Sequence, residues 1–132
     1  SAYQGRANAQ VYARMFARAR RALAAGHSVV LEATFLRRED RAEVRKFAER
    51  AGVPVAPIWL TAPAETLKAR VDARTADASD ATSDVVAAQL ERAPKGPTAW
   101  PEIDASGTVA ETVDRARAQL RKAGVLIHDA PS

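Results

Sequence analysis

The chain contains no cysteine, which excludes disulfide bonds and zinc sites built from thiolates. Its two histidines, His27 and His128, lie far apart in the sequence, so we expect no metal cage made of protein ligands. No apolar run approaches the roughly 20 residues of a membrane-spanning helix, and no basic segment followed by an apolar one opens the sequence. These absences predict a soluble, cytoplasmic protein without a membrane partner.

Lysine is scarce as well, with 4 lysines beside 16 arginines and a net charge of +4. A basic balance is compatible with binding to nucleic acid, to an anionic membrane surface or to a small phosphorylated ligand. A GC-rich coding bias would produce the same excess of arginine and alanine without any functional cause. The composition alone does not choose among these explanations.

The length of 132 residues and the absence of internal repeats and linkers predict a single domain over residues 1–132. Residues 28–31 form a run of apolar or small residues between Gly26 and charged arginines, and this run predicts a buried strand over residues 28–33. Ligands of open parallel sheets gather beyond the carboxyl ends of the strands. Glu32 and Thr34 are therefore candidate site residues, with a strand-end cap or ion pair as the alternative for Glu32.

Helix and strand patterns alternate along the rest of the chain. The spacing of apolar residues, the helix-ending glycines and the capping box of Thr108 and Glu111 place the elements. We predict helices over residues 7–25, 38–51, 63–74, 84–92 and 108–124, strands over residues 28–33, 55–60 and 102–105, a polar lid over residues 75–83, and a short extra strand over residues 125–127. This order is typical of an α/β fold with a parallel sheet.

Five blocks together resemble a known family. They are Tyr12, residues 22–36 followed by Arg41, residues 62–65, residues 70–74 and residues 77–81. In this order and spacing they resemble a group of P-loop kinases, the AAA-type ATP-binding proteins related to gluconate and polynucleotide kinases. The resemblance runs from Tyr3 to about Leu120 and implies a three-layer fold, with helices on both faces of a parallel sheet.

Two departures from the family matter. Glu32 stands where the family has aspartate, and the sequence has no G-x-x-x-x-G-K-[ST] loop to cradle phosphates. The resemblance therefore implies the C-terminal two thirds of a kinase domain, inactive without the phosphate loop. In the family's strand order, residues 28–33 and 55–60 would flank the strand that leads into that loop. We expect a preceding segment or a second chain to complete the sheet.

The resemblance also implies ATP and Mg²⁺ as cofactors and a small molecule with a hydroxyl group as phosphate acceptor. Glu32 would hold Mg²⁺ through a bound water, and Thr34 would lie beside the acceptor or the γ-phosphate. Arg70 and Arg74 resemble lid arginines that reach the phosphates and stack on adenine. Arg41 would contact the acceptor, although an exposed arginine at a helix start is the more common explanation.

Two further groups of residues take their roles from the resemblance. Asp77, Ser79 and Asp80 would belong to the lid, and Asp104, Ser106 and Gly107 would form the loop that borders the adenine.

Two other classes of function remain open. The chain could be a binding module that retains the lid and Glu32 but catalyses no reaction. It could also bind nucleic acid weakly through Arg14, Arg18 and Arg21, which share one stripe of the first helix. No aromatic platform or nucleic-acid motif accompanies that stripe, so we rank nucleic acid last among the expected partners.

Overall fold

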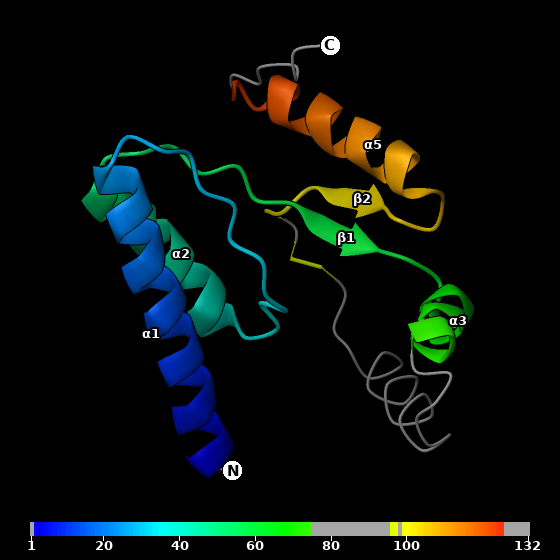
Figure 1. Ribbon diagram of the computed structural model, residues 1–132, viewed down its shortest axis with the longest axis horizontal. Helices are drawn as coiled ribbons and strands as arrows, with labels where there is room; N and C mark the ends of the chain where they lie inside the picture. The colour runs from blue at the N-terminus through cyan, green and yellow to red at the C-terminus, as the bar shows by residue number, and fades with distance from the viewer. Residues whose placement is uncertain (1, 75–95, 98, 126–132) are drawn as a thin grey trace. The chain divides into compact units, whose positions relative to one another are not determined.

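The computed structural model describes residues 2–74, 96–97 and 99–125 (Figure 1). The chain divides into two compact units, unit 1 (Ser1–Val55) and unit 2 (Ala56–Ser132). The predicted lid over residues 75–83 and the predicted helix over residues 84–92 lie outside the described residues, as does most of the predicted strand over residues 125–127. None of the helices within the described ranges combines the length and apolar character needed to cross a bilayer.

Unit 1 consists of two packed helices, α1 (Ala2–Ala24) and α2 (Arg38–Ala51) (Figure 1). Its core joins Ala19 of α1 to three buried residues of one α2 face, Val44, Phe47 and Ala48. The ring of Phe47 lies 5.1 Å from that of Phe16, measured between centroids. The predicted bounds of α2 are confirmed, whereas α1 begins five residues earlier than its apolar pattern indicated.

Residues 28–33 are not a strand, so this prediction was wrong. They lie in an irregular segment between α1 and α2, and the side chain of Val30 is 93% exposed. A strand buried on both faces needs neighbouring strands to satisfy its main-chain amides and carbonyls. Unit 1 offers only helices among its described residues, so the apolar run has no ladder to join.

Unit 2 contains a parallel pair of strands, β1 (Trp59–Thr61) and β2 (Glu102–Asp104), with Leu60 opposite Ile103. The amide of Trp59 donates to the carbonyl of Pro101. The predicted strand over residues 55–60 was placed too early, because Pro57 has no amide to donate to a ladder. The predicted strand over residues 102–105 is confirmed as β2, which ends one residue earlier, and an α/β fold with a parallel sheet is confirmed as well.

Two helices accompany this sheet. Helix α5 (Val109–Lys122) packs on β2, where the side chain of Ile103 is only 5% exposed. Its start is fixed by the predicted capping box, in which the Thr108 hydroxyl accepts from the amide of Glu111 at 3.1 Å. Helix α3 (Ala64–Arg74) follows β1 directly and begins one residue after Pro63.

We predict that Val44→Ala lowers the free energy of unfolding of unit 1 by about 2 kcal/mol, because it removes two buried methyl groups. Val30→Ala is the matched control, since it makes the same chemical change at a side chain that is 93% exposed. Urea unfolding followed by far-ultraviolet circular dichroism measures both variants. Equal stability losses in the two variants would contradict the core described here.

Candidate functional site

Two of the predicted site residues lie in the irregular segment of unit 1. Glu32 and Thr34 are both exposed, so their carboxylate and hydroxyl groups can meet a ligand from solvent. The residue that follows, Phe35, is buried and has a positive φ of 47°. Its amide donates to the hydroxyl oxygen of Tyr12 at 3.1 Å. The end of the segment is thereby attached to helix α1.

Arg41 attaches the same segment to helix α2. Its Nη1 atom donates to the carbonyl oxygens of Phe35, at 2.7 Å, and of Leu36, at 3.0 Å. The structure therefore brings Arg41 to the main chain that directly follows Thr34. A contact between Arg41 and an acceptor substrate stays a prediction.

In unit 2, Arg70 joins helix α3 to the loop that follows β2. Its Nη2 atom donates to the carbonyl oxygens of Ala105 and of Gly107, the latter at 3.2 Å. The predicted ATP-binding residues Arg70, Ser106 and Gly107 are thus close together, although they come from segments more than 30 residues apart. Arg74 is exposed at the end of α3. The lid residues Asp77, Ser79 and Asp80 lie outside the described residues.

The loop after β2 is held by its own polar groups. The Asp104 carboxylate accepts from the amide of Ser106 at 2.8 Å. A hydrogen bond from the Ser106 side chain, together with this amide bond, lowers the pKa of Asp104 below its ordinary value of 3.8, and the charges of Arg115 and Arg70 act in the same direction. Asp104 is therefore anionic at neutral pH.

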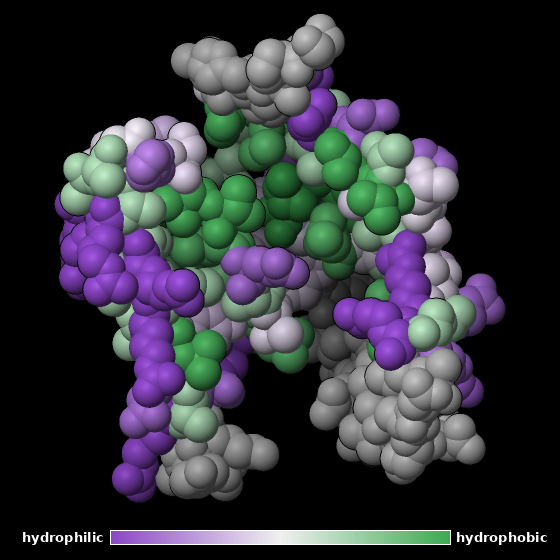
Figure 2. Space-filling model, in the orientation of Figure 1, coloured by the Kyte–Doolittle hydropathy of each residue, from purple (hydrophilic) through white to green (hydrophobic). Residues whose placement is uncertain are grey.

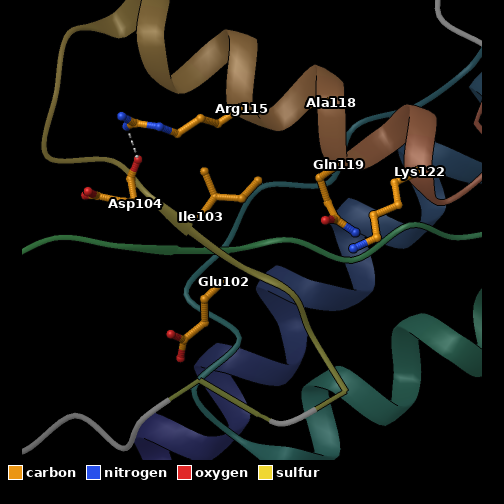
Figure 3. A pocket seen from close by; sticks show the side chains of 7 residues that line it. All are labelled: Glu102, Ile103, Asp104, Arg115, Ala118, Gln119 and Lys122. Atoms are coloured by element: carbon orange, nitrogen blue, oxygen red, sulfur yellow. Dashed lines mark hydrogen bonds between the residues drawn. The ribbon is translucent and has the colours of Figure 1, made fainter.

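Arg115 of α5 is a residue that the sequence reasoning missed. Its Nη1 atom donates to the main-chain carbonyl of Asp104 at 2.9 Å (Figure 3). It also pairs with Glu111, four residues earlier on the helix, at 3.7 Å. The spacing of Glu111 and Arg115 was a signal for a helical ion pair. Nothing in the sequence indicated the bond to the strand end.

A groove of about 320 Å³ lies between β2 and α5 (Figure 3). Both ends of β2 and one face of α5 line it, through Glu102, Ile103, Asp104, Arg115, Ala118, Gln119 and Lys122. Its charged groups are of both signs, and Ile103 supplies an apolar floor. Of the predicted ATP-binding residues, only Asp104 lines this groove. The groove therefore adjoins the loop after β2 but does not by itself form the predicted nucleotide site.

The arrangement of carboxylates bears on the expected Mg²⁺. Within the described residues, no group of three or more histidine, aspartate and glutamate side chains could hold a metal ion by itself. Mg²⁺ in nucleotide sites usually keeps several waters and is held by one or two carboxylates plus the phosphates. The exposed Glu32 fits such a water-mediated role. A site with a single protein carboxylate is therefore compatible with magnesium bound together with a nucleotide.

Basic residues concentrate in unit 1, which holds eleven arginine and lysine residues against five acidic ones within residues 1–55. Several of the exposed arginines belong to α1, where hydrophilic side chains follow the helix in Figure 2. They are Arg6, Arg14, Arg18, Arg20 and Arg21. An excess of positive charge attracts anions, including the phosphates of nucleotides, over a distance set by the ionic strength.

Comparison with known proteins places the chain in the P-loop class of nucleotide-binding proteins. Residues 1–95 match a family model described as an AAA domain. This match covers more than half of the 132 residues, so the protein belongs to this P-loop kinase-like AAA family, and the resemblance seen in the sequence is confirmed. Proteins of this class generally bind nucleotides with Mg²⁺. No curated protein and no solved structure matches the chain.

We predict that Ser106→Ala raises the pKa of Asp104 toward 3.8, because it removes the largest of the interactions that lower it. The amide of residue 106 still donates, so the rise is partial. Since the folded-state pKa is depressed, ionised Asp104 contributes stability above the unfolded-state pKa, and this contribution is lost as the pH falls through the folded-state pKa.

An NMR titration of the Asp104 carboxyl carbon measures this change, with Ser28→Ala as the control at an exposed serine of unit 1. The stability difference between wild type and Ser106→Ala should shrink in acid. A pKa of Asp104 that is the same in wild type and Ser106→Ala would show that the Ser106 hydroxyl does not hold the loop.

Proposed function

We propose that this chain forms part of an ATP-dependent P-loop kinase that transfers the γ-phosphate to a hydroxyl group of a small molecule. Membership of the AAA-domain family supports the class of cofactor. The observation that carries the proposal is the pair of hydrogen bonds from Arg70 to the carbonyls of Ala105 and Gly107. It joins the helix that leads into the expected lid to the loop expected to border adenine.

The two arginines of α3, Arg70 and Arg74, would have different roles in nucleotide binding. Phosphoryl transfer depends mainly on positioning and on positive charge around the transferred group. The exposed guanidinium of Arg74 is suited to the phosphates, because it can approach them from solvent. Arg70 shapes the adenine-bordering loop through its carbonyl bonds. Asp104 and Ser106 keep the other side of that loop in one conformation.

Glu32 and Thr34 of unit 1 take their proposed roles from the family resemblance. Mg²⁺ bound with ATP would neutralise part of the negative charge of the phosphates. Glu32 would hold a water of that ion, and Thr34 would orient the acceptor hydroxyl or the γ-phosphate. Both side chains are exposed and only two residues apart, which makes them available to one ligand.

The phosphate loop of such a kinase is not among these 132 residues. We propose that a segment outside them, or a second chain, supplies it and completes the sheet. The 132-residue chain alone is then expected to turn over no ATP.

We predict that Arg74→Ala, made in the complete gene product, lowers ATP turnover at least about a hundredfold and leaves the melting temperature unchanged. The reason is that an exposed arginine acts through the phosphates and not through packing. Arg70→Ala should lower both turnover and melting temperature, because it also releases the loop after β2. Coupled-enzyme detection of ADP and thermal unfolding measure the two effects.

Arg45→Ala serves as the control, since it removes an exposed arginine from α2. If Arg74→Ala turns over ATP at the wild-type rate, the proposed contact between Arg74 of α3 and the phosphates is wrong. If the complete gene product neither binds nor hydrolyses ATP, the proposed kinase function is wrong.

A further inference from the structure

Phe35 has a main-chain conformation that its residue type disfavours. It is the one non-glycine residue with a positive φ, 47°, within the described residues. The left-handed region brings the β-carbon of an L-residue close to its own main chain, and a bulky side chain seldom adopts it. Such a conformation persists only where the surroundings hold it, and it is frequent beside functional sites.

Two helices hold Phe35 in this conformation. From α1, the Tyr12 hydroxyl accepts from the Phe35 amide at 3.1 Å, and the two rings lie 5.5 Å apart with a tilt of 48°. From α2, Arg41 donates to the Phe35 carbonyl at 2.7 Å and to the next carbonyl, of Leu36, at 3.0 Å. The amide, the carbonyl and the ring of Phe35 are all bound, and the side chain is only 6% exposed.

The residues just before Phe35 depend on these contacts. Residues 27–34 have no regular secondary structure that could orient Glu32 and Thr34. Thr34 is bonded directly to Phe35, so fixing the φ of Phe35 fixes the direction in which the chain leaves Thr34. The strained residue is buried and the two predicted site residues beside it are exposed. A buried residue held in one conformation next to exposed side chains can serve as a support that orients them.

We propose that Tyr12 and Arg41 are positioning residues, which lock Phe35 in the left-handed conformation and thereby hold Thr34 and Glu32 toward the phosphate and the acceptor. The proposal rests on the kinase function proposed above. It gives Arg41 a role through the main chain instead of the acceptor contact predicted from the sequence. It gives Tyr12 a role that its place on an amphipathic helix did not indicate.

Two variants test whether Tyr12 and Arg41 hold Phe35 in the left-handed conformation. Tyr12→Phe keeps the ring contact and removes only the oxygen that accepts from Phe35. Arg41→Met keeps the apolar stem and removes the donor to both carbonyls. Arg45→Met, one helical turn further along α2, makes the same change at an exposed arginine and is the matched control.

The first measurement is amide hydrogen exchange by NMR on the 132-residue chain. In Tyr12→Phe the Phe35 amide should exchange about tenfold faster or more, because it loses its protein acceptor. Both variants should shift the resonances of residues 34–36, while amides within α1 and α2 keep their wild-type rates. If the exchange rate of the Phe35 amide is the same in Tyr12→Phe as in wild type, the positioning role of Tyr12 is wrong. Faster exchange spread evenly over both helices would also contradict the proposal, because it would indicate a general loss of stability.

The second measurement is steady-state kinetics on the complete gene product. Both variants should lower kcat about tenfold or more and leave KM for ATP within about twofold, since misplaced groups slow the transfer without loosening the nucleotide. A wild-type protein without turnover contradicts the proposed function. An active wild type whose kcat is unaffected by both variants contradicts the lock alone.

Discussion

The parallel pairing of β1 with β2 is the interaction on which the described part of unit 2 depends. Once Leu60 lies opposite Ile103, one face of β2 can be covered by α5, and the loop after β2 comes within reach of α3. In unit 1 no such pairing exists among the described residues, and the apolar run at residues 28–31 stays irregular. The same demand for main-chain partners explains both the strand that forms and the strand that does not.

Arginine performs one task at three places in this protein. Arg41, Arg70 and Arg115 each donate to a main-chain carbonyl of a residue that the family resemblance assigns to the site, or of its neighbour in the sequence. A guanidinium group presents several donors in a rigid plane, whereas the ammonium group of lysine is a compact point charge. Arg41 uses this geometry to reach two successive carbonyls. Part of the preference for arginine over lysine in the composition therefore has a structural cause.

Local signals in the sequence were enough to predict several elements. The bounds of α2 followed from its apolar spacing and from Gly52, which has a positive φ of 68° after the helix end. The start of α5 followed from Thr108 and Glu111, because a capping box is a contact between residues three apart. The family was also recognisable from short blocks in a fixed order, and the match over residues 1–95 confirmed it.

Features that depend on distant residues could not be predicted in this way. Whether residues 28–33 form a strand depends on a neighbouring strand that local pattern does not reveal. The bond from Arg70 to Gly107 spans 37 positions, and an arginine on a helix surface usually needs no partner at all. The positive φ of Phe35 had no signal, because glycine or asparagine would have indicated it and phenylalanine does not.

The sequence separation of β1 and β2 has a consequence for the order of folding. Thr61 and Ile103, which share a hydrogen bond, are 42 positions apart, whereas only residues 25–37 connect α1 to α2. Contacts between distant residues must close a long loop before they gain any stability, so the sheet should form after the helix pair. Both tryptophans of the chain, Trp59 and Trp100, lie in unit 2 with their rings 6.2 Å apart. Tryptophan fluorescence, excited at a wavelength that tyrosine does not absorb, therefore reports the closure of the sheet and not the earlier pairing of the helices, because both tyrosines, Tyr3 and Tyr12, lie in α1.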